Sequence, residues 1–400
     1  MFALVGSFTA GVLAELIGAR VAFEKMIDPR CAASWAAWCA RAQNLVVAYL
    51  LIHIGLMGGA EMAQAGIARF AVSGTLCVIL ALAMFGVAWA GAFALRVTED
   101  AKTRISLATH FGSVSIGTFA TVQTYLTSQG IAFDPASAAW LTLMEVPSLF
   151  AGILLLGGGW ESLRRMLLDR DLILLLGSLL AGCLLGPTVV HQFDFIIATP
   201  FELVLCYFLL NMGIRAGKQI AQIKTSGGKL IAFGVFTPAI GAGLGIVIGG
   251  LANLQMGDII ILGTLAASAS YVAAPAVMGK QVPAQAIATS LAVSLGVTLP
   301  WNILIGIPIY TGVAQMTMNT GARGLFLLVA FLALASAATI WVFRCGNPAP
   351  AKRAIPFARS VPKVVGYVDN HPPNRFDVAR VARRDLRLPR ARDDPQSGGI

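Results

Sequence analysis

Apolar segments long enough to cross a membrane recur along this chain and are separated by short polar connections. A helix of about 20 apolar residues crosses the roughly 30 Å hydrocarbon core of a bilayer, and strand-like alternation is absent here. We therefore predict an all-α polytopic membrane protein. The eleven predicted spans cover about 2–22, 44–62, 70–95, 106–127, 137–159, 171–190, 200–216, 229–251, 258–278, 286–312 and 322–344.

Matching features in two groups of five spans predict an internal repeat. Because five is an odd number, the second copy enters the membrane from the opposite side, and the repeat is inverted. Three pairs of features match in the same order, 153 to 158 positions apart: 51–59 with 209–217, 113–115 with 268–270, and Pro147 with Pro300. We thus expect a five-plus-five inverted-repeat transporter fold with two discontinuous helices.

This repeat divides the chain into five parts. Residues 1-159 form the first five-helix repeat and residues 171-316 the second, joined by a short cytoplasmic linker at 160-170. An additional transmembrane helix follows at 317-345. The remaining residues, 346-400, are rich in proline and arginine, and we predict a disordered cytoplasmic tail that contacts membrane lipids. No nucleic-acid-binding module is visible in it.

Composition and charge agree with this division. The chain is 57% hydrophobic and only 12% charged, which excludes an ordinary soluble domain. Lysine and arginine gather in the connections after odd-numbered spans, whereas the opposite connections hold only Arg69 and Arg323. Since positive charge marks the cytoplasmic side, we predict a multi-pass protein of the plasma membrane (the bacterial inner membrane) with its N-terminus outside and its tail in the cytoplasm. The first apolar run begins at Phe2 without preceding basic residues, so we expect it to be a membrane span and not a cleaved signal peptide.

Two hydroxyl-rich runs interrupt the fourth and ninth spans, at equivalent places in the two halves. A helix that stops inside the membrane leaves free N–H groups and the positive end of its dipole facing a cavity, so two such ends form an anion site. Small residues alone also pack helices together, which is the alternative interpretation. The predicted substrate-binding residues are Gly112, Ser113, Val114, Ser115, Ala267, Ser268, Ala269 and Ser270.

A carboxylate inside the fifth span requires a cation, a proton or a polar partner, because it is expensive to bury in hydrocarbon. Glu145 is that residue, and Asn302 and Thr298 lie near the matching place in the tenth span. We predict that these three bind a coupling cation; a structural hydrogen bond beside Pro147 is the alternative for Glu145. His53 and His110 lack a carboxylate at metal-ligand spacing, so interior histidines are expected.

In these residues the chain resembles the SbtA-type sodium-dependent bicarbonate transporters. The resemblance implies bicarbonate and sodium bound between the discontinuous helices, a homo-oligomer (a trimer), and a PII-like cytoplasmic regulator. Tyr271 stands where the cyanobacterial members have an acidic residue, so it cannot supply that charged sodium ligand. The stretches that carry the resemblance are 51–59, 111–115, 143–148, 210–214, 266–275 and 307–315.

These observations together predict a secondary active transporter that takes up a small anion, first of all bicarbonate, with sodium as coupling ion and no other cofactor. A sodium- or proton-coupled carrier of another small carboxylate or inorganic anion is the alternative. An intramembrane serine hydrolase using Ser113 or Ser115 with a histidine is a remote one, because no G-x-S-x-G elbow is present. The last alternative is a membrane sensor without transport activity. We therefore do not expect an enzyme.

Overall fold

The computed structural model describes residues 2–18, 29–197, 199–223, 228–321, 323–324 and 327–329, which are helical and contain no β-strand. The helices of the first part are α1 (Phe2–Leu16), α3 (Pro29–Ala65), α4 (Ile67–Ala94), α5 (Ala101–Gly112), α6 (Ile116–Ser128), η1 (Pro135–Ser137) and α7 (Ala138–Leu155). Next come α8 (Trp160–Leu167), α9 (Arg170–His191), α10 (Asp194–Ile197) and α11 (Phe201–Ile223). The last are α12 (Gly228–Leu251), α13 (Met256–Ala266), α14 (Ala273–Met278), α15 (Ala284–Val293), η2 (Ser294–Thr298), α16 (Leu299–Trp301), η3 (Asn302–Gly306) and α17 (Ile307–Thr320).

The predicted spans correspond closely to these helices. Within the described residues, eight helical segments are long and apolar enough to cross a membrane, and they match the second to eighth and the tenth predicted spans. The first and ninth predicted spans match the shorter apolar helices α1 and α13. Residues 330–400, which hold most of the predicted eleventh span and the whole 346–400 tail, lie outside the described residues. An all-helical, multi-pass membrane protein is thereby confirmed.

Two segments that the predicted spans leave as connections contain helices. α3 begins at Pro29, well before the predicted second span, in an alanine-rich stretch that favours helix. α8 occupies most of the predicted linker. It is amphipathic: Leu163 and Met166 are buried, while Glu161 and Arg165 form an exposed ion pair at 3.2 Å. The connection between the halves is therefore a short surface helix.

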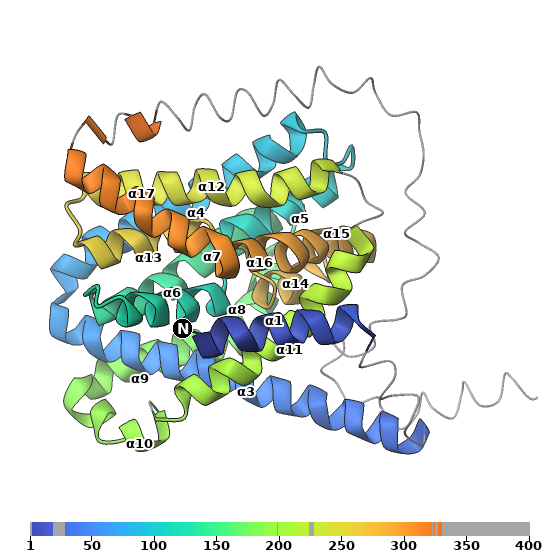
Figure 1. Cartoon of the computed structure of the whole chain (residues 1–400), viewed down its shortest axis with the longest axis horizontal. Coiled ribbons are helices and arrows are strands. Elements are labelled where there is room, and N and C mark those ends of the chain that lie inside the picture. The colour runs from blue at the N-terminus through green and yellow to red at the C-terminus, as the bar shows by residue number, and fades with distance from the viewer. Residues whose placement is uncertain are drawn as a thin grey trace, which may run out of the picture. The chain divides into compact units, whose positions relative to one another are not determined.

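Close backbone contact joins helices from different halves of the chain in two places. α1 packs on α11 and α3 packs on α9, and each pair runs side by side in Figure 1. A Cβ atom on Gly213 would collide with the Phe8 carbonyl oxygen, and one on Gly182 would collide with the Leu56 carbonyl oxygen. Glycine at such places lets two helix backbones touch, which drives helix association in lipid.

The glycine stripe of α12 makes a third close contact. Gly241 lies against the Ala266 carbonyl and Gly245 against Gly263, so α12 packs tightly on α13. These two glycines therefore serve helix packing. The segment of α5 and α6 is the most enclosed of the eight. In its most apolar stretch 94% of the residues are buried, compared with 22% in the most apolar stretch of α9. The interrupted helices therefore lie inside the helical bundle and α9 exposes most of its surface.

The tenth predicted span is less regular than a single helix. α15 and α17 are joined by two π-helical turns, η2 and η3, with the short α16 between them. Pro300 lies in α16 and has no N–H to continue an α-helical ladder. Irregular turns of this kind leave carbonyl groups free to accept side-chain hydrogen bonds.

Candidate functional site

The fourth predicted span is interrupted at Ser113–Ser115, as the serine run predicted. α5 ends at Gly112 and α6 begins at Ile116, and the backbone between them is extended, with φ −100° and ψ 164° at Ser113. Ser115 caps α6, because its Oγ accepts hydrogen bonds from the Thr118 N–H and the Thr118 hydroxyl, each at 3.1 Å. A serine that accepts from the third residue of a helix is a standard N-cap, so Ser115 starts the second half of the span.

The ninth predicted span is interrupted in the same way. α13 ends at Ala266 and α14 begins at Ala273. The Ser270 hydroxyl accepts a hydrogen bond from the Ala274 N–H at 3.2 Å, and the Ser268 hydroxyl donates to the Leu265 carbonyl at 2.7 Å. Both serines are fully buried. The hydroxyls of Ser115, Ser268 and Ser270 thus satisfy backbone groups freed by the two breaks.

The two interruptions are in direct contact. The Ser115 N–H donates to Ser268 Oγ at 3.0 Å, and the Ser270 N–H donates to the His110 carbonyl at 2.8 Å. The predicted substrate-binding serines therefore come together from segments that lie far apart in the sequence. Ala269 packs beside Phe111 in a separate apolar cluster.

Glu145 reaches both interruptions from α7. Its Oε2 accepts from the Val114 N–H at 3.2 Å, and its Oε1 accepts from the Ser270 hydroxyl at 3.0 Å. The Ser113 hydroxyl is buried next to the same carboxyl but makes no hydrogen bond of standard geometry. Glu145 is only 6% exposed and forms no ion pair within the described part of the chain. The Glu145 carboxylate thus accepts hydrogen bonds from the Val114 N–H and the Ser270 hydroxyl, which are donors that a bound anion would use.

Gly112 and Ala267 have packing roles at the edges of the interruptions. A Cβ on Gly112 would collide with the Ser148 hydroxyl, so this glycine lets α7 approach α5. Ala267 lies between Ala242 and Tyr310. Of the eight predicted substrate-binding residues, Val114 and Ser270 bond to Glu145, and Ser115 bonds to Ser268.

The three predicted cation-binding residues have different hydrogen-bond partners. Asn302 donates from Nδ2 to the Ala267 carbonyl at 2.8 Å, and its Oδ1 accepts from the Tyr310 hydroxyl at 2.9 Å. Thr298 donates to the Gly234 carbonyl at 2.9 Å. Neither has a hydrogen bond to Glu145. Asn302 thus holds the second interruption from the side of η3, and Thr298 joins η2 to α12.

A small cavity lies beside Glu145. Its volume is about 20 Å³, which is sufficient for one water-sized particle. Ser115, Ser270 and Tyr271 line it together with Glu145, and so does Asp171 of α9. Sequence reasoning missed Asp171, since an acidic residue in the first turn of a helix is common. Only the packing of α9 shows that it faces this cavity.

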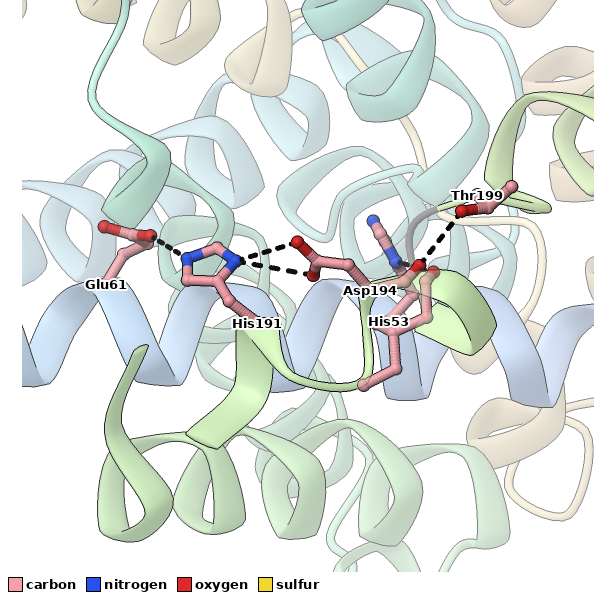
Figure 2. A network of polar contacts seen from close by, with 6 residues as sticks. His53, Glu61, His191, Asp194 and Thr199 are labelled. Atoms are coloured by element: carbon pink, nitrogen blue, oxygen red, sulfur yellow. Dashed lines mark hydrogen bonds and ion pairs between the residues drawn. The ribbon is translucent and has the colours of Figure 1, made fainter. Parts of the chain in front are cut away.

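Two histidines, His53 and His191, belong to a separate polar network. His53 donates from Nδ1 to the Ile197 carbonyl at 2.6 Å, and His191 bridges Glu61 at 3.4 Å and Asp194 at 3.2 Å (Figure 2). This network joins α3 to the end of α9 and to α10. His110 bonds the Ser106 carbonyl within its own helix at 2.8 Å. Among the described residues no group of three His, Cys, Asp or Glu side chains suits a metal ion.

Comparison with known proteins identifies the family. None of the curated proteins compared with the chain matches it. The family model described as the Na+-dependent bicarbonate transporter superfamily matches residues 33–315, which include both interruptions, Glu145 and the cavity beside it. This is a family of transporters, in agreement with the expectation that the protein is not an enzyme. By this match over most of its length, the chain belongs to the Na+-dependent bicarbonate transporter superfamily.

Proposed function

We propose that this protein takes up bicarbonate together with sodium by alternating access, with the anion bound at the two interruptions. The observation that carries this proposal is the contact between Ser115 and Ser268, which joins two discontinuous helices beside a buried carboxylate. Family membership supports both ions. The anion would take hydrogen bonds from the Val114 N–H and from the hydroxyls of the four serines, with no lysine or arginine required.

The close helix contacts support an inverted repeat. α1 belongs to the first predicted span and packs on the seventh, while α9 belongs to the sixth and packs on the second. Gly213 and Gly55 correspond in the predicted repeat, and each lies against the backbone of its partner helix. The pairs α4 with α5 and α12 with α13 correspond likewise. We propose that residues 1-159 and 171-316 are antiparallel copies that move relative to each other during transport.

Orientation and assembly complete the proposal. We place the N-terminus outside and the 346-400 tail in the cytoplasm of the bacterial inner membrane, following the distribution of lysine and arginine. A homotrimer and a PII-like regulator are proposed from the resemblance alone. Sodium is the only cofactor that the proposed transport requires.

Uptake into vesicles tests the function. Purified protein is reconstituted into liposomes, and entry of labelled bicarbonate is measured with sodium or with choline outside. We expect uptake to require sodium, and competition by unlabelled acetate, sulfate and bicarbonate compares the candidate anions. Equal uptake in sodium and in choline would reject sodium coupling. If another anion competes more strongly than unlabelled bicarbonate does, that anion and not bicarbonate is the substrate.

Alanine substitutions then test the site. S115A and S270A remove hydroxyls from the two interruptions, and each is expected to reduce sodium-dependent uptake steeply while the protein still inserts into the membrane. S128A serves as the matched control, because Ser128 is exposed at the end of α6 and bonds only to the Tyr125 carbonyl. Normal uptake by the S115A/S270A double variant would exclude these serines from the site.

A further inference from the structure

We infer that Tyr271 is a positioning residue of the proposed anion site: its side chain sets how closely the second interruption approaches the first turn of α6, and Gly117 gives it room. The inference rests on the proposed function and assigns Tyr271, which lines the cavity beside Glu145, a role in that function. Tyr271 directly follows Ser270, and Gly117 lies two residues after Ser115. Both residues are buried.

The phenol oxygen of Tyr271 lies directly against Gly117. A Cβ atom on Gly117 would collide with that oxygen, and it would also lie 3.0 Å from Cε1 of Phe208 in α11. Phe208 is completely buried, and Tyr271 is only 4% exposed, so neither ring has solvent to move into. A side chain at residue 117 is therefore incompatible with the observed position of the Tyr271 hydroxyl.

The backbone of α6 does not itself require glycine at this position. Gly117 is in the first turn of the helix and is not among the glycines with a positive φ angle. Glycine is also a poor helix former, so a side chain would be favoured here if there were space for one. The close approach of the Tyr271 hydroxyl accounts for the glycine, and the two residues form a matched pair.

This pair adds a third link between the two interruptions. The other two are hydrogen bonds, from the Ser115 N–H to Ser268 Oγ at 3.0 Å and from the Ser270 N–H to the His110 carbonyl at 2.8 Å. The proposed anion donors come from both interruptions, so a shift of one against the other changes the distances between those donors. Binding groups must be held to within a fraction of an ångström, and Tyr271 therefore acts on the affinity for the anion through its neighbour Ser270 and through α6.

The test adds the missing Cβ atom and then removes the atom that it meets. In the full-length protein, G117A places a methyl group against the Tyr271 hydroxyl. Y271F removes that oxygen and keeps the ring, so the double variant G117A/Y271F relieves the collision with the hydroxyl. G177A is the matched control, because a Cβ on Gly177 in α9 would meet open space. The measurement is the initial rate of sodium-dependent uptake as a function of bicarbonate concentration.

We expect G117A to raise the half-saturating bicarbonate concentration about tenfold, since an overpacked methyl group displaces its neighbours. G117A/Y271F should recover most of this loss, and Y271F and G177A should stay near the wild type. Y271A, which removes the whole ring, should raise the half-saturating concentration as G117A does. A double variant with the same half-saturating concentration as G117A would overturn the inference, and so would wild-type values in both G117A and Y271A.

Thermal unfolding in detergent separates this inference from the proposed function, because it requires no transport. We expect a lower unfolding temperature in G117A and its recovery in G117A/Y271F. If this recovery is seen but wild-type vesicles take up no bicarbonate, the contact stands and the transport proposal fails. If the unfolding temperature recovers while every variant keeps the wild-type half-saturating concentration, Tyr271 only packs and does not position the site, and the inference is wrong.

Discussion

The Ser270 hydroxyl donates a hydrogen bond to Glu145 Oε1 at 3.0 Å and so joins the second interruption to the middle of α7. The same hydroxyl accepts from the Ala274 N–H, which starts α14. Ser270 therefore uses both of its hydrogen-bonding capacities inside the protein. The Glu145 carboxylate is thus bonded to a serine of the second interruption that also contacts the first turn of α14.

The first prediction concerns the charge of Glu145. E145Q keeps the size of the side chain but replaces one acceptor oxygen with an NH2 group, which would face either the Val114 N–H or the Ser270 hydroxyl. We expect sodium-dependent uptake to fall about 10- to 100-fold, since a hydrogen bond to a charged group contributes roughly 1.5–3 kcal/mol. Vesicle uptake measures this. E161Q is the control, because Glu161 is exposed on α8, and equal uptake by E145Q and E161Q would contradict the role of Glu145.

The second prediction concerns the contact between the interruptions. S268A removes the acceptor of the Ser115 N–H and leaves that group buried without a partner. Leaving such a donor unsatisfied costs about 1–3 kcal/mol. We expect a lower thermal unfolding temperature in detergent and weaker uptake. An S268A protein as stable and active as S128A would show that this hydrogen bond contributes little.

The third prediction concerns helix packing in α9. Gly182 touches the Leu56 carbonyl of α3, whereas a Cβ on Gly177 in the same helix would meet open space. We expect G182A to separate α3 from α9 and to destabilise the fold by about 1–3 kcal/mol or more. G177A should be neutral or stabilising by up to about 1 kcal/mol, because alanine favours helix. Thermal unfolding of the two variants compares them, and equal unfolding temperatures would argue against close packing at Gly182.

The fourth prediction concerns pH and the start of α5. Asp100 caps this helix, and the hydrogen bond from the Thr103 hydroxyl holds the pKa of its carboxyl below the usual value. A lowered pKa means that ionised Asp100 stabilises the folded state fully above about pH 3.9, and that this stabilisation disappears as the pH falls through the lower folded-state pKa. D100N should lose this pH dependence and keep the cap. D100A should lose about 1 kcal/mol at neutral pH.

Unfolding curves recorded at several acidic pH values and at neutral pH check the cap. A wild-type stability that changes with acid in parallel with D100N would show that the Asp100 carboxyl does not contribute. D100A as stable as D100N at neutral pH would show that the side chain does not cap α5.

Much of the fold could be predicted because membrane spans and their interruptions depend on local sequence. The length of the apolar runs predicted the helices, and the first serine run predicted the break before α6, since the Ser115 N-cap requires only its own neighbours. The start of α3 at Pro29 was missed, because its polar residues hid the helix-forming alanines. The π-helical turns η2 and η3 were missed as well, since Pro300 alone does not indicate where a helix widens.

The site was harder to predict because it depends on contacts between distant helices. Glu145 could be found, as a carboxylate within an apolar span is unusual. Asn302 was assigned to a cation from the repeat, yet its amide bonds the Ala267 carbonyl and the Tyr310 hydroxyl. Asp171 could not be found, because its sequence neighbours are those of an ordinary helix start, and only the placement of α9 shows its exposure to the cavity.

The glycines between α3 and α9, and between α1 and α11, affect how a mutational survey of this protein should be interpreted. A Cβ on Gly59, Gly182 or Gly213 would collide with the backbone of a neighbouring helix, so we expect replacements there to lower the amount of folded protein in the membrane. In a survey that measures growth alone, substitutions at these glycines would give defects as strong as substitutions at Ser115 and Glu145. They would differ in the amount of mature protein recovered from membranes, so such a survey must score abundance separately from solute accumulation.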